Sequence, residues 1–130
     1  MLVISIHGIP GDTKELEVLA ENIVDETMNI EGLEVLPDHI SVFFIAGLPT
    51  KTLGKEIIVY VNGLFANPER TLKVRKALAE RTLIVVALFA SDHIKKCRSV
   101  KVFINQFNPK NGFATISLQE FAKKQIRPIG

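Results

Sequence analysis

The first 46 residues carry the hydrophobic pattern of a strand, a helix and a second strand. Residues 2–9 alternate weakly between apolar and polar and are rich in Val and Ile, which is typical of a strand. The run Gly8-Ile9-Pro10-Gly11 ends it, and Asp12 with Glu15 has the spacing of a capping box. Residues 39–46 form the second predicted strand. Between them, apolar positions at helical intervals predict a helix ending near Asn29: Leu16, Leu19, Ala20, Ile23, Val24 and Thr27.

The same plan repeats after a turn-rich connection that contains Gly47, Pro49 and Gly54. Residues 56–62 predict a third strand and residues 99–107 a fourth. Between them we predict a helix that is capped by Asn67, has Pro68 in its first turn and turns one apolar face inward. That face comprises Val74, Leu78, Val85 and Phe89.

Two β-α-β units, residues 1–46 and 55–107, therefore account for most of the chain and leave a tail, residues 108–130. A length of 130 residues fits a single domain. Parallel strands joined by a helix cross over with one handedness, so both helices should cover the same face. The predicted fold class is α/β (α+β): a four-stranded mixed sheet with two helices on one face.

The other face of this sheet would expose apolar side chains. Residues 42–45 and 57–59 are apolar without a break, so these strands carry apolar residues on both sides. Residues 83–90 of the second helix are apolar all round. A large exposed apolar patch is typical of an interface, so we expect self-association. The alternative is that the tail folds back over the sheet.

Composition limits the binding partners and the cellular compartment that we expect for this protein. Sixteen basic and fourteen acidic residues give a net charge of +2, which does not indicate a nucleic-acid partner. Cys97 is the only cysteine, and no secretory leader or membrane-spanning apolar run is recognisable, so we expect a cytoplasmic protein with no membrane association. The histidines and the cysteine lack metal-ligand spacing, and no phosphate-binding loop follows a strand. We expect neither metal nor cofactor.

Three local stretches resemble the tautomerase superfamily. Val102-Phe103-Ile104-Asn105-Gln106-Phe107 is similar to the Val-Tyr-Ile-Asn-Tyr-Tyr strand of the macrophage migration inhibitory factor branch. Leu78-Ala79-Glu80-Arg81 resembles the end of that branch's second helix. The stretch from Phe107-Asn108-Pro109 to Phe113 resembles the segment after the last strand in the 5-carboxymethyl-2-hydroxymuconate isomerase branch. In order and spacing, the resemblance covers nearly the whole chain.

The resemblance implies a homotrimer whose sheets form an inner barrel, with each active site beside the N-terminus at a subunit boundary. In the family, removal of the initiator Met exposes a proline whose amine shuttles a proton on 2-keto acids and their enols. Here the second residue is Leu2, whose size normally prevents removal of Met1. The catalytic proline is therefore absent, and the amine of Met1 is the remaining catalytic candidate. A primary α-amine has a pKa of about 8, so it can act as a base or form an imine.

Further positions of the family's pocket are changed or kept. Val35 falls near the family's lysine and Phe103 falls on its tyrosine, so two polar groups are lost. Asn105 matches the family's asparagine. Arg70 falls where the isomerase branch has Gly-Arg-Ser, and its guanidinium can pair bidentately with a carboxylate. The resemblance therefore implies a pocket with Arg70 as a catalytic candidate and with Phe103 and Asn105 as substrate-binding candidates.

Geometry adds candidates from two strands. Parallel pairing should place the start of the second strand beside the start of the first, which brings Asp38 and His39 near the pocket as an acid–base pair. A turn Asp followed by a surface His is the alternative interpretation. Asn62 and Leu64 lie near the end of the third strand, which in the family lies close to the pocket, although Leu64 also fits simple packing.

Three functions remain open on the sequence. The favoured one is a ligand-binding or altered-chemistry homotrimer that holds a small carboxylate or keto acid near the N-terminus. The first alternative is an active keto–enol tautomerase that uses the Met1 amine and Arg70. The second is a ferredoxin-like small-molecule sensor module, because a β-α-β repeat also suits that class.

Overall fold

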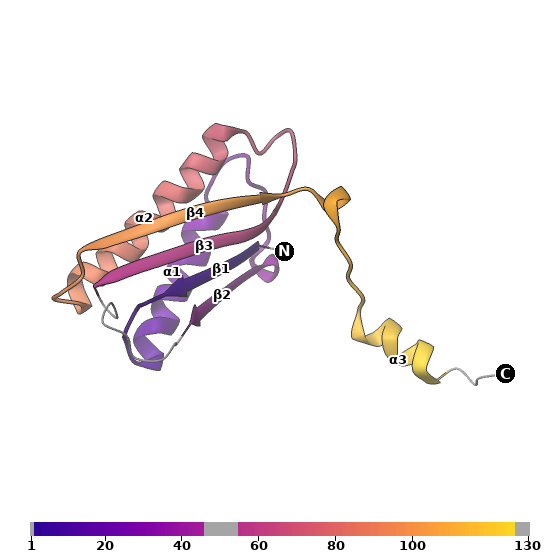
Figure 1. Ribbon diagram of the computed structural model, residues 1–130, viewed down its shortest axis with the longest axis horizontal. Coiled ribbons are helices and arrows are strands. Elements are labelled where there is room, and N and C mark those ends of the chain that lie inside the picture. The colour runs from indigo at the N-terminus through magenta and orange to yellow at the C-terminus, as the bar shows by residue number, and fades with distance from the viewer. Residues whose placement is uncertain (1, 46–54, 127–130) are drawn as a thin grey trace.

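The computed structural model describes residues 2–45 and 55–126 of the chain (Figure 1). The predicted strands and helices are present, and apart from the start of the second helix the predicted bounds lie within a few residues of the observed ones. The connection that contains Gly47, Pro49 and Gly54 lies outside the described residues. The elements in chain order are β1 (Leu2–His7), α1 (Thr13–Met28), β2 (Ile40–Ile45), β3 (Glu56–Phe65), α2 (Leu72–His93), β4 (Ser99–Phe107) and α3 (Leu118–Ile126).

The strands form one mixed sheet in the order β2-β1-β3-β4. β2 pairs with β1 in parallel, β4 pairs with β3 in parallel, and the central strands β1 and β3 are antiparallel. Figure 1 shows α1 and α2 side by side on one face. This confirms the predicted fold class. The two strands of each β-α-β unit are direct neighbours, so the split arrangement of a ferredoxin-like sheet is absent from the described strands.

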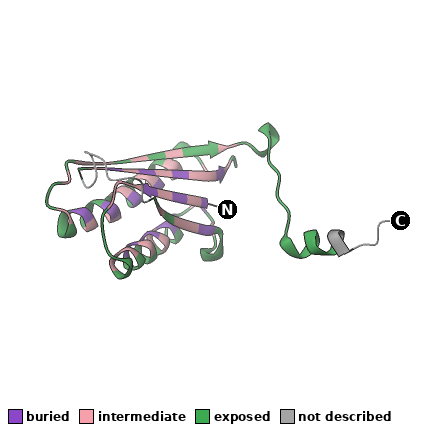
Figure 2. Ribbon diagram, turned by 60° about the horizontal axis from the view of Figure 1, so that its bottom comes forward, coloured by how far each residue is buried: buried purple, intermediate pink, exposed green. Residues whose placement is uncertain are grey.

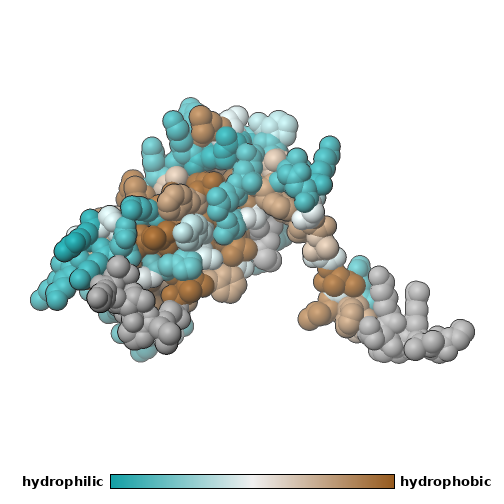
Figure 3. Space-filling view, viewed as in Figure 1, coloured by the Kyte–Doolittle hydropathy of each residue, from teal (hydrophilic) through white to brown (hydrophobic). Residues whose placement is uncertain are grey.

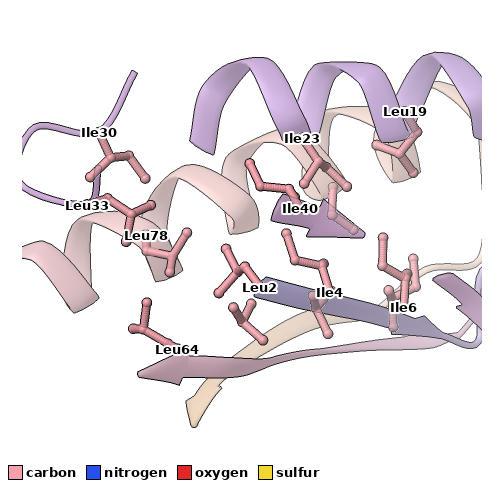
Figure 4. Close-up of a cluster of buried hydrophobic side chains, with 14 of the residues drawn as sticks. Leu2, Ile4, Ile6, Leu19, Ile23, Ile30, Leu33, Ile40, Leu64 and Leu78 are labelled. Atoms are coloured by element: carbon pink, nitrogen blue, oxygen red, sulfur yellow. The ribbon is translucent and has the colours of Figure 1, made fainter. Parts of the chain in front are cut away.

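The core lies between the sheet and the two helices. Along β1 and β3 every second side chain is buried, which places Ile4, Ile6, Val59 and Val61 under the helices (Figures 2 and 4). Leu19 and Ile23 of α1 close the core from above. Both units contribute to this core, so neither buries its apolar face alone.

The start of the first helix agrees with its sequence signal. The carboxylate of Asp12 accepts a hydrogen bond of 2.8 Å from the backbone N–H of Glu15, which satisfies one of the free donors at the helix N-terminus. Leu19, Ile23 and Thr27 of the predicted face are buried. The Thr27 hydroxyl donates to the Ile23 carbonyl, so its polarity is satisfied within the helix.

The predicted start of the second helix was wrong. The Asn67 side chain accepts from the backbone N–H of Glu69, and its carbonyl accepts from the N–H of Arg70, so Asn67 and Pro68 belong to a separate turn. α2 begins after Thr71, whose hydroxyl accepts from the N–H of Val74. Asn67 and Thr71 are both residue types that cap helices. Asn67 stabilises the preceding turn, and Thr71 caps the helix.

The buried stripe of α2 is Leu78, Thr82, Val86 and Ala90, at four-residue intervals. Of the predicted face, Leu78 is fully buried, and the other three residues pack partly buried against the core. Because Thr82 is polar, a search for apolar positions at helical intervals does not find this stripe. The Thr82 hydroxyl has no hydrogen-bond partner among the described residues.

The described part of the tail, residues 108–126, does not cover the open face of the sheet. After β4 the described chain makes a short turn at Pro109–Asn111 and then leads α3 away from the body (Figure 1). The sheet face opposite the helices is therefore uncovered by the described residues. No helix within residues 2–45 and 55–126 is long and apolar enough to cross a membrane.

The corrected helix start leads to a stability prediction. Thr71→Ala removes the acceptor for the Val74 N–H and should lower the free energy of unfolding by about 1 kcal/mol. Asn67→Ala is the matched control, because its side chain serves the preceding turn, and it should cost less. Urea denaturation of both variants checks this. A larger loss for Asn67→Ala would place the helix start at the earlier residue.

Candidate functional site

A cavity lies where β1 begins and where β3 and β4 end. It has a volume of about 680 Å³. The lining comes from the first strand, the turn before β2, the ends of β3 and β4, and the segment after β4. Its residues are Val3, His39, Asn62, Gly63, Phe65, Asn105, Gln106, Phe107, Phe113, Ala114 and Thr115.

A β-bulge near the end of β3 shapes this cavity. The pairing of β3 with β4 runs regularly to Val61, opposite Ile104, and resumes at Leu64, opposite Gln106, so β3 holds one extra residue. Gly63 has a φ of +79°, a left-handed conformation that glycine adopts without strain. The bulge reverses which face the following residues take. Leu64 therefore points into the core, while Phe65 lines the cavity.

Three side-chain amides in the cavity are oriented by hydrogen bonds. The Asn105 amide group donates to the Asn62 side-chain oxygen at 2.6 Å. The guanidinium of Arg75 donates to the Gln106 side-chain oxygen at 3.1 Å and to the Arg70 carbonyl at 3.0 Å. The amide N–H groups of Asn62 and Gln106 have no partner within the described residues. Two of the lining residues therefore keep an unused neutral donor, and Asn105 keeps a free acceptor.

The remaining wall is aromatic. Phe65 and Phe113 meet edge to face with ring centroids 4.9 Å apart, and Phe107 lies 6.0 Å from Phe65. Such pairs add a preferred geometry to the burial of apolar surface. Phe113 comes from the segment after β4, so that segment completes one side of the cavity. Together with Val3, these rings suit a ligand that has an apolar part beside its polar group.

Three of the predicted site residues meet in this cavity. Asn62 and Asn105 face each other across β3 and β4, and His39 approaches from the turn before β2. The parallel register places Leu2 beside Ile40, which is why His39 lies next to the start of β1. Asp38 is exposed in the same turn and does not line the cavity.

The other predicted residues lie elsewhere. Leu64 is 1% exposed in the core, and Phe103 lies on the open sheet face. Arg70 does not line the cavity: its guanidinium donates to the carbonyls of Leu33 and Phe65 at 3.2 and 2.9 Å. Met1, whose amine was the catalytic candidate, lies outside the described residues.

Sequence reasoning missed the contribution of Gln106 and of the segment from Phe113 to Thr115. Gln106 follows the matched Asn105, so alternation turns its side chain toward α2, where Arg75 donates to it, and the cavity extends to Gln106 at the end of the strand. The segment after β4 was treated only as a tail. Its signal was Phe113, an aromatic residue shortly after the strand, which packs on two strand-end rings.

An aromatic row crosses the open face of the sheet. Strand register aligns Phe43, Ser5, Tyr60 and Phe103, and Tyr60 stacks on Phe103 with ring centroids 5.5 Å apart. His7 meets Tyr60 edge to face. Phe43 and Phe103 are each about half exposed. The row therefore leaves aromatic surface exposed on this face.

An ion pair between β3 and β4 lies on the open face. Lys101 donates a 2.7 Å hydrogen bond to Glu56, and this bond together with the charge of Lys101 lowers the pKa of the Glu56 carboxyl. Both side chains are exposed, so the pair is screened by solvent. Within the described ranges no three His, Cys, Asp or Glu residues gather as a metal site would require.

The position of Arg70 leads to a prediction. Arg70→Met should lower the free energy of unfolding by about 2 kcal/mol, because it leaves the Leu33 and Phe65 carbonyls without their charged donor. Arg81→Met is the control: Arg81 pairs with Glu26 on the surface, and its loss should change stability by less than about 1 kcal/mol. Equal effects in thermal or urea unfolding would contradict a structural role for Arg70.

A scan of protein-family models and a search of curated proteins found no match. Solved structures do match. A fused 4-OT wild-type asymmetric trimer has a TM-score of 0.64 at 11% identity, with 92% of this chain and 98% of that chain covered. Pt0534 inactivated by 2-oxo-3-pentynoate has a TM-score of 0.61 at 16% identity, with 84% and 88% covered.

A member of the cis-3-chloroacrylic acid dehalogenase family has a TM-score of 0.61 at 15% identity, and the match covers 97% of this chain and 92% of that chain. These structures all belong to the tautomerase superfamily. At such low identity the likeness concerns the backbone, and it spans both β-α-β units. The chain therefore has the fold of the tautomerase superfamily, as the local sequence resemblance implied.

Proposed function

We propose that this protein is a self-associating, tautomerase-like protein that binds a small carboxylate or keto acid in the cavity beside the start of β1. The observation that carries the proposal is the pair of free amide donors, on Asn62 and Gln106, among the residues that line a cavity of about 680 Å³ with one aromatic wall. Carboxylate and keto oxygens accept hydrogen bonds, and the rings favour an aryl or alkyl substituent. A phenylpyruvate-type acid combines both features.

The arrangement supports binding more than the family's proton transfer. The residue after Met1 is Leu2, whose side chain is 2% exposed in the core. The resemblance to the family would require a proline amine at this point. The cavity's amides hold a ligand without taking a proton, because an amide is not a base at neutral pH. His39 is the one titratable side chain that lines the cavity in the described part of the chain.

Ligand binding can be tested with phenylpyruvate and two cavity variants. Phenylpyruvate should raise the melting temperature of the full chain. Asn62→Leu and Gln106→Leu should each weaken its binding about tenfold or more, because a hydrogen bond to a charged group contributes about 1.5–3 kcal/mol. Gln119→Leu, far from the cavity on α3, should leave the affinity unchanged. No shift with the unaltered chain, or equal loss in all three variants, would contradict the proposal.

Chemistry at the N-terminus is separated from binding by two further measurements. Ketonisation of enol-phenylpyruvate should proceed at the uncatalysed rate if the protein only binds. Because 2-oxo-3-pentynoate inactivates the structurally similar Pt0534, it serves as a probe of a reactive amine. Turnover above background, together with a 2-oxo-3-pentynoate adduct on the N-terminal peptide, would instead indicate an active tautomerase that uses the Met1 amine.

Self-association through the open sheet face is the second part of the proposal. The half-exposed rings of Phe43 and Phe103 lie in one row with Tyr60, and the described residues leave this row uncovered. The fused 4-OT neighbour is described as a trimer, which supports three copies as the assembly to expect here. Burial of the row in a homotrimer would remove the exposed apolar surface.

A charge placed in this row should disrupt the assembly. Phe103→Asp is expected to shift the sedimentation coefficient from that of a trimer to that of a monomer, because a carboxylate would be buried without a partner. Leu72→Asp offers a control, since Leu72 is 58% exposed at the start of α2 and lies away from the sheet. A monomer for the unaltered protein, or an intact trimer for Phe103→Asp, would contradict the proposed interface.

A further inference from the structure

The chain ends in an exposed apolar arm, which we define as residues 112–126. It begins at Gly112, whose φ is +123°, and ends with α3. Ile116 and Leu118 are 47% and 82% exposed, and Phe121 is 45% exposed. Figure 3 shows these apolar side chains at the surface of the arm, away from the main body.

The helix of this arm is specified by its sequence. The Ser117 hydroxyl accepts a hydrogen bond of 3.1 Å from the N–H of Glu120, which is the start of a capping box. Leu118, Phe121 and Ala122 then fall at i, i+3 and i+4, which places them on one face. A nine-residue helix is too short to be stable alone in water, so it requires a surface to pack against.

The helical layer holds a groove with matching chemistry. Between α1 and α2 lies a cavity of about 450 Å³. Val18 and Leu88 line it and are 55% and 63% exposed, and Leu88 belongs to the stretch of α2 that is apolar all round. We call it the helix groove. Unlike the open sheet face, it is not used by the assembly proposed above.

Charge distinguishes the helix groove from the open sheet face. Glu15 and Asp92 line the groove together with Glu26, which pairs with Arg81, and α1 carries five acidic residues against one lysine. The helix of the arm carries two lysines, Lys123 and Lys124, against one glutamate. The open face instead presents Lys101 and Glu56, which already pair with each other. A basic helix with an apolar face therefore fits the groove better than the sheet.

In the structure the arm does not occupy the groove of its own chain. Asp92 and His93 line the groove just before β4 begins, whereas the arm follows the end of β4. The nine residues of β4 separate these two points by about 30 Å. The arm points away from its own helices in Figure 1. The arm leads away from its own chain, and this course favours a second copy of the chain as the occupant.

We propose that α3 of one copy docks in the helix groove of another copy, with Leu118 and Phe121 on the apolar floor and Lys123 toward the acidic residues. The contact is heterologous, because two different surfaces of the chain meet. It is separate from the pairing of open sheet faces. The occupant is a second copy, and a different protein with a basic amphipathic helix is the competing outcome.

Disulfide trapping between two full-length variants tests the contact. Both carry Cys97→Ala to remove the single native cysteine. One adds Phe121→Cys and the other, which carries a mass tag, adds Leu88→Cys. Mild oxidation of the mixture should link the two different chains. Ala122→Cys, one position along the same helix face, should repeat the result if Phe121→Cys impairs folding.

Matched positions make the result specific. Leu72→Cys lies on the same helix with similar exposure, sixteen residues or about 24 Å from Leu88, and should give at least several-fold less linked product. Lys123→Glu should lower the yield several-fold, whereas Lys110→Glu, outside the arm, should not. Equal linkage at Leu72, preferential linkage to Phe43→Cys on the open face, or no linkage would overturn the proposal. Phe103→Asp separates the two contacts, because it should leave the arm linkage intact.

Discussion

The antiparallel pairing of β1 with β3 is the interaction on which the rest of this structure depends. Each β-α-β unit buries only one side of a two-stranded parallel ribbon, which is too little for a stable core. Joining the units through their first strands places both helices on the same face, where Ile4 and Val61 become fully buried. The same pairing leaves the opposite face without a helix.

The position of the cavity follows from this arrangement. Because β3 runs opposite to β1, it ends where β1 begins, and the parallel partners bring His39 and the end of β4 to the same place. The bulge at Gly63 then turns Phe65 out of the core and toward the cavity. Residues from the first strand to the segment after the last one thus share one small volume.

Within the described residues, exposed apolar side chains gather on the open sheet face, in the helix groove and on the arm. Phe43, Leu88 and Leu118 represent the three surfaces. Exposed apolar surfaces of this kind are typical of interfaces, and the two contacts proposed above rest on them. Two of the surfaces differ in charge, which gives a means of keeping their contacts distinct.

The sequence by itself determined the strands, both long helices, the repeat and the fold class, because caps such as Asp12 and apolar periodicity are local properties. It also indicated Asn62, Asn105 and His39, which the cavity brings together. Only the tertiary structure decided that Leu64 is in the core, and that Arg70 holds backbone carbonyls. These outcomes depend on the extra residue in β3 and on the order of the four strands. Neither feature can be predicted from a local sequence pattern.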